Sequence, residues 1–187
     1  SSGDAGSMTI IALNQAEVYA NLKRFDEATT LLQQTFQTAQ ETRQRVQMAY
    51  ILIGQGTLAQ KQDDWKTAQS RYEQALEIAR GVHSAGAEGR ALGYLAEVYL
   101  HEANASYAIR LLREALPKLN QANDLEPSSL FVGRLGQALI ASGQDAEGEQ
   151  LLERALRLAK QTAYKQYERQ WDIALADRAL NRGQSEE

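Results

Sequence analysis

The stretch Gly56-Thr-Leu-Ala-Gln-Lys-Gln-Asp-Asp-Trp65-Lys-Thr-Ala68-Gln-Ser-Arg-Tyr72-Glu-Gln-Ala75 decides the fold of this chain. Small residues stand at 56, 68 and 75, with the aromatic residues Trp65 and Tyr72 among them. Spacings of three, four and seven residues place these side chains on one face of a helix. Small residues let two backbones approach closely, and large residues fill the space between neighbouring helices. The stretch therefore predicts two packed helices joined by a short turn.

The same pattern recurs with a period of 40 and without a gap. The columns of small residues are Ala16/Gly56/Ala96/Gly136/Ala176, Ala28/Ala68/Ala108/Gly148 and Thr35/Ala75/Ala115/Ala155. The columns of mostly large residues are Leu32/Tyr72/Leu112/Leu152, Phe36/Leu76/Leu116/Leu156 and Tyr19/Ala59/Tyr99/Leu139. One helix pair has too little apolar surface to bury alone, so successive pairs must stack and share a core. The period predicts an all-α array of four helix pairs.

The expected helices cover 8–22, 25–43, 45–61, 65–82, 87–101, 105–120, 127–141, 145–160 and 162–181. Asp64 and Asn104 should cap the helices that follow them, and Gly143 should end a helix in a left-handed conformation. Pro117 should kink or shorten the sixth helix, because proline lacks an amide donor. The three glycines in Gly81–Gly89 predict a loop there.

The array is expected to span 8–182, with units at about 9–45, 46–84, 87–124 and 127–161 and a capping helix at 162–182. The cap combines apolar Trp171, Ile173 and Leu175 with a charged outer face, as the end of such an array requires. The first seven residues are small and polar, which suggests a flexible leader or cloning scar before a native start at Met8. Alternatively, the chain is a fragment of a larger protein. The tail 183–187 should be mobile.

Composition excludes several classes of function. Hydrophobic residues make up 43% and charged residues 24% of the 187 residues, which is typical of a folded chain. The net charge of −4 and the absence of a basic run argue against a nucleic-acid binder. The lack of cysteine excludes disulfides and thiolate chemistry. No apolar run approaches the roughly 20 residues that span a bilayer, so we expect no membrane segment and take a cytoplasmic location as the working expectation.

These residues resemble the tetratricopeptide repeat family, over nearly the whole chain from Thr9 to about Arg182. That family has small residues near its eighth, twentieth and twenty-seventh positions and aromatic or large residues near its eleventh, seventeenth and twenty-fourth. The second unit matches it with Gly56, Trp65, Ala68, Tyr72 and Ala75. The first unit matches it with Ala16, Tyr19, Phe25, Ala28 and Leu32. The resemblance implies a right-handed α-solenoid of antiparallel helix pairs.

Two features depart from the family pattern. The common family period is about 34 residues. This chain instead has a period of 40, which is similar to the subgroup with extended second helices, found in mitotic-spindle adaptors, kinesin light chains and the sensor regions of bacterial signalling ATPases and transcription activators. The third and fourth units have Ala105 and Asp145 where the family has an aromatic residue at the turn. We expect those turns to be less well packed.

The resemblance implies that a peptide or helix binds in a concave groove lined by the first helix of each pair. Carried onto this chain, the polar and aromatic groove positions are Asn14, Glu17, Asn21, Tyr50, Thr57, Lys61, Arg90, Tyr94, Glu97, His101, Arg134 and Gln137. Three cations stand against two carboxylates in this set, so the groove is expected to be neutral to slightly basic. A partner segment bearing carboxylates would suit it, since arginine holds a carboxylate through two hydrogen bonds. The alternative is that these are ordinary solvated side chains.

Single residues allow rival interpretations. Of the family's carboxylate-holding pattern for chaperone peptides, only Arg90 fits, so that specificity is not predicted. Trp65 and Trp171 could stack on a ligand, but large aromatic side chains favour burial in the array. Glu97 and His101 are four residues apart and could begin a metal site, yet a surface pair is the simpler reading. No phosphate-binding glycine loop and no nucleophile–base–acid set is apparent.

The sequence therefore predicts a non-catalytic protein–protein interaction scaffold that needs no cofactor or metal. A second hypothesis is a sensor or regulatory module of a larger signalling ATPase or transcription regulator, binding a small molecule or its own other domains. The two hypotheses differ in the size of the ligand and in the rest of the polypeptide. The sequence does not specify the partner, apart from the acidic character suggested above.

Overall fold

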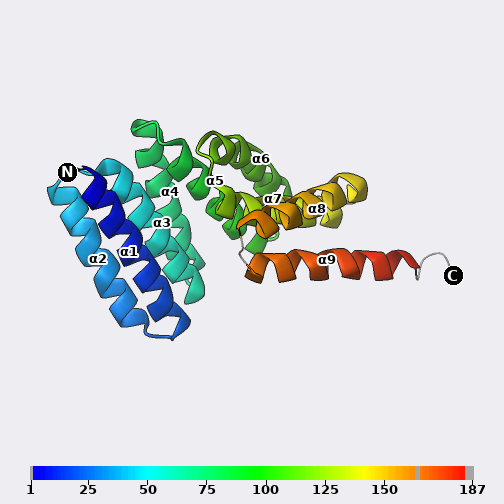
Figure 1. Cartoon of the computed structure of the whole chain (residues 1–187), viewed down its shortest axis with the longest axis horizontal. Helices are drawn as coiled ribbons and strands as arrows, with labels where there is room; N and C mark the ends of the chain where they lie inside the picture. Colours follow the sequence, from blue (N-terminus) through cyan, green and yellow to red (C-terminus); the bar gives the residue numbers. More distant parts are fainter. Residues whose placement is uncertain (1, 163–164, 184–187) are drawn as a thin grey trace. The chain divides into compact units, whose positions relative to one another are not determined.

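The computed structural model describes residues 2–162 and 165–183, and the regular structure in these ranges is entirely helical (Figure 1). The helices are α1 (Ser2–Asn21), α2 (Phe25–Glu41), α3 (Arg45–Lys61), α4 (Trp65–Gly81), α5 (Ala85–His101), α6 (Ala105–Gln121), α7 (Leu125–Ala141), α8 (Asp145–Thr162) and α9 (Lys165–Gly183). This all-α repeat architecture confirms the predicted fold class. Residue 1 and the end of the predicted tail, 184–187, lie outside the described residues.

Most helix ends lie within two residues of the prediction, and α3 has the predicted bounds. The start of α1 was predicted six residues too late, so the supposed leader is helical from Ser2 onward. The loop predicted across Gly81–Gly89 is restricted to the turn at 82–84, and α5 includes Gly86 and Gly89. Both glycines are buried, so tertiary packing outweighs their low helix propensity.

Every connection from α1 to α8 is the same three-residue turn. Its middle residue has positive φ, and these residues recur at a constant spacing: Lys23, Arg43, Asp63, His83, Ala103, Asn123 and Gly143. The next amide closes a six-residue loop onto the preceding helix, as when Arg24 N donates to Tyr19 O at 2.9 Å. This bond satisfies a carbonyl that the helix end leaves open. Asp64 and Asn104 cap the next helices as predicted, accepting from the amides of Thr67 and Tyr107.

Pro117 neither ends nor shortens α6, which continues to Gln121. Of the two effects predicted, a kink or a shortened helix, the shortening is contradicted, and the kink stays a prediction. Leu116 and Leu119, on either side of the proline, are buried, whereas Pro117 itself is exposed. Packing of the buried face holds the helix together, and the bond that the proline cannot make is lost on the solvent side.

The chain divides into two compact units, residues 1–98 and 99–187, and the boundary falls within α5. In unit 1, α1 to α4 lie side by side, and one cluster joins α1, α2 and α3 (Figure 1). That cluster comprises Ala16, Ala20, Ala28, Leu32, Ala39, Ile51 and Leu58. A Cβ added at Gly56 would overlap the ring of Tyr72, so the small column does lie at a close helix contact.

In unit 2, α7 and α8 approach even more closely. A Cβ on Gly136 would lie 2.7 Å from the carbonyl oxygen of Gly148, and the reverse distance is 2.6 Å. Trp171 of α9 is fully buried against Gly133, and its indole nitrogen donates to Ser129 Oγ at 3.3 Å. Helix α9 thus packs against α7 and α8, and its role as a cap stays a prediction.

Candidate partner-binding surface

The predicted groove residues lie on first helices of the pairs and fall into both units. Nine of them belong to unit 1, on α1, α3 and α5, and we call these nine the first-helix surface: Asn14, Glu17, Asn21, Tyr50, Thr57, Lys61, Arg90, Tyr94 and Glu97. Three belong to unit 2, namely His101, Arg134 and Gln137. All twelve side chains are exposed or half-buried, so each can be reached from solvent.

A contact between α1 and α3 joins equivalent positions of successive repeats. Lys61 Nζ donates to Asn21 Oδ1 at 2.5 Å. Both side chains are exposed, and the acceptor is a neutral amide. The bond therefore holds the lysine in place without cancelling its positive charge.

A second contact at the same spacing joins α3 and α5. The guanidinium of Arg90 lies over the ring of Tyr50, with its central carbon 5.8 Å from the ring centroid. The attraction between a cation and an aromatic face orients the arginine, and the guanidinium keeps its charge. Both side chains are half-buried, so the stacked pair forms part of the surface and part of the packing between helices.

Tyr94 of α5 continues this surface towards α4. Its ring stacks on Tyr72, with centroids 5.4 Å apart and an interplanar angle of 15°. The Tyr72 hydroxyl donates to Gln60 Oε1 at 2.9 Å. Burial raises the pKa of Tyr72 far above its ordinary value, and the nearby Tyr94 and Glu97 raise it further. Tyr72 therefore stays neutral and serves as a fixed support for the half-exposed Tyr94.

Of the three predicted residues in unit 2, two contact each other. Arg134 Nη1 donates to Gln137 Oε1 at 3.2 Å on α7, and His101 is exposed at the end of α5. Within residues 2–162 and 165–183, no three histidine, aspartate or glutamate side chains gather as a metal site would require. The metal alternative at Glu97 and His101 thus gains no third ligand in the described part of the chain.

The two tryptophans differ in their surroundings. Trp171 is fully buried in unit 2, in agreement with its predicted packing role. Trp65 is only half-buried, and its indole nitrogen donates to Asp63 Oδ1 at 2.6 Å in the turn that precedes α4. Trp65 therefore stabilises the turn before α4, and its side chain is less enclosed than that of Trp171.

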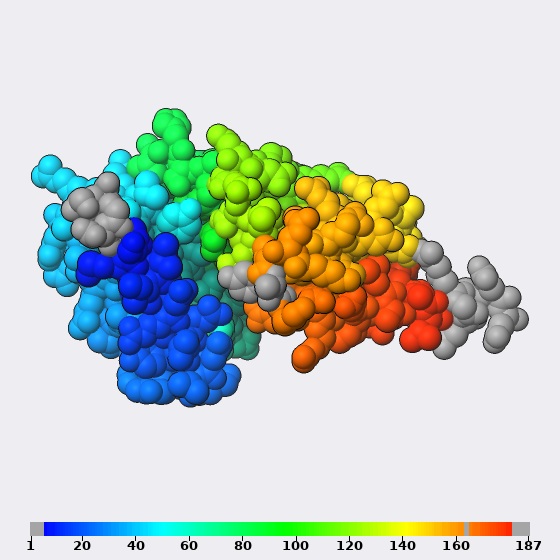
Figure 2. Space-filling view, viewed as in Figure 1, coloured from blue at the N-terminus to red at the C-terminus, as the bar shows by residue number. Residues whose placement is uncertain are grey.

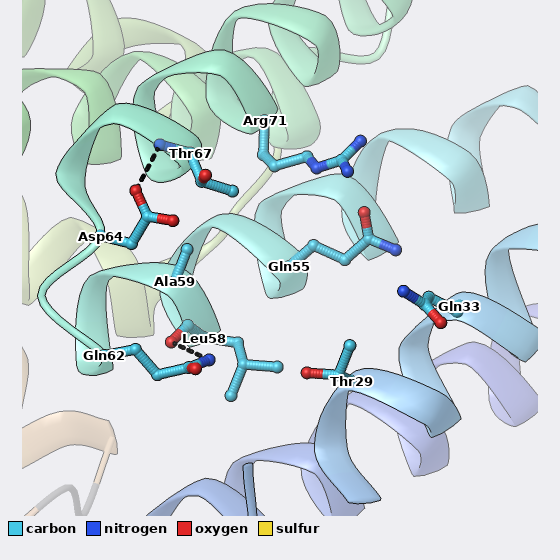
Figure 3. Close-up of a pocket in the computed structure, with 9 residues that line it drawn as sticks. All are labelled: Thr29, Gln33, Gln55, Leu58, Ala59, Gln62, Asp64, Thr67 and Arg71. Carbon is cyan, nitrogen blue, oxygen red and sulfur yellow. Dashed lines mark hydrogen bonds between the residues drawn. The ribbon is translucent and has the colours of Figure 1, made fainter. Parts of the chain in front are cut away.

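A polar pocket of about 150 Å³ lies elsewhere in unit 1, between α2, α3 and α4 (Figure 3). It is lined by Thr29, Gln33, Gln55, Leu58, Ala59, Gln62, Asp64, Thr67 and Arg71. Figure 3 shows the guanidinium of Arg71 and the amides of Gln33 and Gln55 extending towards the same side of the pocket. The Asp64 carboxylate at the other side is engaged by Thr67, whose hydrogen bonds lower the pKa of Asp64.

Sequence reasoning missed this pocket, although the repeat contains a signal for it. Position 71 belongs to a column whose other members are Leu31, Leu111 and Leu151. A half-buried arginine replaces leucine in the second repeat alone. A charged residue in an otherwise apolar column indicates a position where polar contacts replace apolar packing.

Comparison with known families finds the same period. A family model described as tetratricopeptide repeat matches residues 7–81 and, in a second placement, 47–121. The two placements are offset by one repeat and together cover more than half of the chain. No curated protein sequence gives a significant match. Within the described residues, no helix is both long and apolar enough to cross a bilayer.

Solved structures share the fold at low sequence identity. Aspartyl phosphate phosphatase F from Bacillus subtilis superimposes with a TM-score of 0.73 and 12% identity, over 89% of this chain and 44% of the phosphatase. A putative kinesin light chain from Podosopora anserina gives 0.62 and 20%, over 83% and 77%. A signal transduction ATPase with a tetratricopeptide repeat sensor from Pyrococcus horikoshii gives 0.63 and 17%, over 85% and 25%. This chain therefore spans less than half the length of the phosphatase and a quarter of the ATPase.

Proposed function

We propose, from the premise that this chain belongs to the tetratricopeptide repeat family, that its first-helix surface binds a peptide or helix of a partner protein. Proteins of this family generally act through such binding, and the matched family is not a catalytic one. The observation that carries the proposal is the pair of contacts that fix Lys61 and Arg90 through neutral groups, each joining matching positions of successive repeats.

These contacts suit a partner segment that bears carboxylates. The Asn21 amide positions Lys61 without neutralising its charge, and the Tyr50 ring orients the guanidinium of Arg90. An arginine held in place by stacking loses less conformational freedom when it binds, so its two hydrogen bonds to a carboxylate contribute more. Tyr94 adds a rigid, half-exposed ring beside them, of the kind enriched at protein interfaces.

Six other residues of the set have secondary roles in this proposal. Asn14 and Glu17 are exposed on α1 and supply polar contacts at the edge of the surface. The Thr57 hydroxyl donates to Gly54 O at 2.9 Å, so it contributes mainly to the shape of α3. His101, Arg134 and Gln137 would form a second contact area in unit 2.

Affinity capture with quantitative mass spectrometry tests the proposal. The wild-type chain is compared with Lys61→Ala/Arg90→Ala and with the charge-matched control Lys66→Ala/Arg43→Ala, which removes two exposed cations outside the surface. Proteins that bind this surface should be depleted about tenfold or more by the first variant and retained by the control. A captured set that is the same for all three chains would refute the proposal.

The polar pocket supports a second candidate function, the binding of a small molecule by a regulatory module. The Arg71 guanidinium and the surrounding amides and hydroxyls can hold a small carboxylate, and the solved ATPase described above carries a repeat sensor. A thermal-shift series with acetate, succinate, glutarate and citrate probes this candidate. The melting temperature should rise with one of these anions in the wild type and not in Arg71→Leu, which restores the leucine of the column. Equal shifts in both chains would exclude the pocket.

A further inference from the structure

Helix α1 and Leu22, the first residue of the turn after it, carry a stripe of exposed apolar side chains. Met8, Ile11, Val18 and Leu22 are 65%, 64%, 55% and 60% exposed. With Gln15 they are spaced by three, four, three and four residues, which places all five on one face of the helix. Figure 2 shows α1, in dark blue, at the surface of unit 1. Four large apolar side chains in one row form a patch of the kind that marks an interaction site.

The later repeats show what this face is built to contact. Ile51 and Leu58 stand one full repeat after Ile11 and Val18, and they are 0% and 6% exposed. They are buried in the cluster that includes Ala28 and Leu32 of α2. The two columns that pack against another helix in the second repeat are therefore exposed to solvent in the first. The element that would best cover Ile11 and Val18 is accordingly a helix.

We propose that the occupant is α1 of a second copy of this chain, packed antiparallel about a two-fold axis at Gln15. The stripe is nearly symmetric about that residue, with apolar side chains seven and four positions before it and three and seven after it. An antiparallel copy places Met8 against Leu22 of the partner subunit and Ile11 against Val18 of the partner subunit. Each apolar side chain meets an apolar one, as a self-complementary two-fold interface requires.

Polar residues around the stripe favour the same arrangement. Its rim on one side consists of the uncharged residues Ser7, Asn14 and Asn21, and the Lys61 ammonium lies on Asn21 at one end of it. The antiparallel arrangement places Asn21 beside Ser7 of the partner subunit, so the two lysines are kept at opposite ends of the contact. Gln15 is exposed and uses Nε2 to donate to the Tyr19 hydroxyl at 3.0 Å. Its carbonyl oxygen and second amide hydrogen can pair with Gln15 of the partner subunit. A single polar residue in an apolar seam fixes the register of the two helices.

Sedimentation equilibrium of the purified chain over a range of concentrations is the first test. We expect a monomer–dimer equilibrium for the wild type. Ile11→Glu/Val18→Glu should raise the dimer dissociation constant about a hundredfold or more, because the dimer would bury four unpaired carboxylates. The control Ile173→Glu changes an exposed isoleucine on α9 and should leave the dimer intact. Circular dichroism checks that each variant retains its helix content.

Disulfide trapping tests the geometry, since the chain contains no natural cysteine. Gln15→Cys lies on the proposed axis and should form a covalent dimer under oxidising conditions. Met8→Cys alone should not, but it should cross-link when mixed with Leu22→Cys. Self-linking of Met8→Cys would indicate parallel helices and overturn the proposed arrangement.

A monomer at every concentration would overturn the proposal altogether. That result is expected if the stripe instead packs against a helix pair that precedes α1 in a longer polypeptide. The proposed dimer and the proposed partner-binding surface share Asn14 and Asn21, but Lys61 and Arg90 lie outside the stripe. Lys61→Ala/Arg90→Ala should therefore dimerise like the wild type.

Discussion

The helix pairs α3–α4 and α7–α8 occupy equivalent places in the array, two repeats apart, yet they pack through different contacts. In α3–α4, Gly56 leaves room for the ring of Tyr72, and the second helix presents Ala68. In α7–α8, Gly136 faces Gly148 directly. The position equivalent to Tyr72 is Leu152, which has a smaller side chain. One pair makes space for a side chain, whereas the other brings its two backbones together.

The next helix along shows a similar exchange. Gly133 of α7 accommodates Trp171 of α9 in unit 2. The equivalent positions in unit 1, again two repeats earlier, are Ile53 and Ala91, and both are buried. In unit 2 the small residue is on α7 and the large one on α9, whereas in unit 1 the large residue is on α3 and the small one on α5. At this second contact the repeat keeps one large and one small residue and leaves open which helix supplies the large one.

The largest expected effect comes from removing the side chain that fills the unit 2 contact. Trp171→Ala should lower the free energy of unfolding by about 3–5 kcal/mol, because it empties a fully buried site beside Gly133. Urea denaturation followed by circular dichroism measures the change.

A double-mutant cycle sharpens this prediction. Gly133→Ala alone should destabilise the protein, since its Cβ would overlap the indole ring of Trp171. In the Trp171→Ala background the same change should be neutral or stabilising, because alanine favours helix and the ring is gone. If Gly133→Ala costs the same in both backgrounds, the two residues are not coupled as described.

The next prediction separates a side-chain clash from a backbone clash. Gly56→Ala and Gly136→Ala should each cost about 1–3 kcal/mol through overpacking. The Gly56→Ala Cβ meets the Tyr72 ring, so adding Tyr72→Leu, the residue type found at 152, should recover most of the loss. The Gly136→Ala Cβ meets the carbonyl oxygen of Gly148 at 2.7 Å. No side-chain substitution can move that oxygen.

The measurement is again the free energy of unfolding, with Tyr72→Leu alone as the control. That single change removes the hydrogen bond to Gln60 as well as ring volume, so its own cost must be subtracted. For unit 2, Gly136→Ala is combined with Leu152→Ala. Rescue by this second change would mean that the backbones of α7 and α8 separate more easily than the structure indicates.

The sequence was sufficient to predict the fold because its information is periodic. Small and large columns at one constant spacing predict the helices, and Asp64, Asn104 and Gly143 mark three of the turns correctly. Shortening at Pro117 was wrongly allowed for, because a local propensity rule does not account for the buried leucines beside it. The early start of α1 was missed because small polar residues carry no helical periodicity.

The candidate site was less accessible to sequence reasoning than the fold. The period places Lys61 and Arg90 on first helices, but it cannot show that an amide and a ring hold them. Whether these residues bind a partner stays a prediction. The polar pocket forms where three helices meet, which the sequence does not reveal. Its one signal in the sequence is Arg71, which stands in a column otherwise occupied by leucine.

The smallest expected effect concerns two turns of unit 2 that share one backbone shape. The middle residue is Ala103 in one turn and Gly143 in the other, with φ of 58° and 81°. A residue with a Cβ is strained in left-handed geometry by about 1–2 kcal/mol, and glycine relieves this strain. Glycine also increases the conformational entropy of the unfolded chain, which offsets part of the gain in stability. Ala103→Gly should therefore stabilise the protein by about 0.5–1 kcal/mol, and Gly143→Ala should destabilise it by a similar amount. A Cβ at Gly143 would have no atom within 4 Å, so the backbone alone accounts for that change. Thermal unfolding of both variants measures the effect, and shifts of the same sign would show that the two turns are not equivalent.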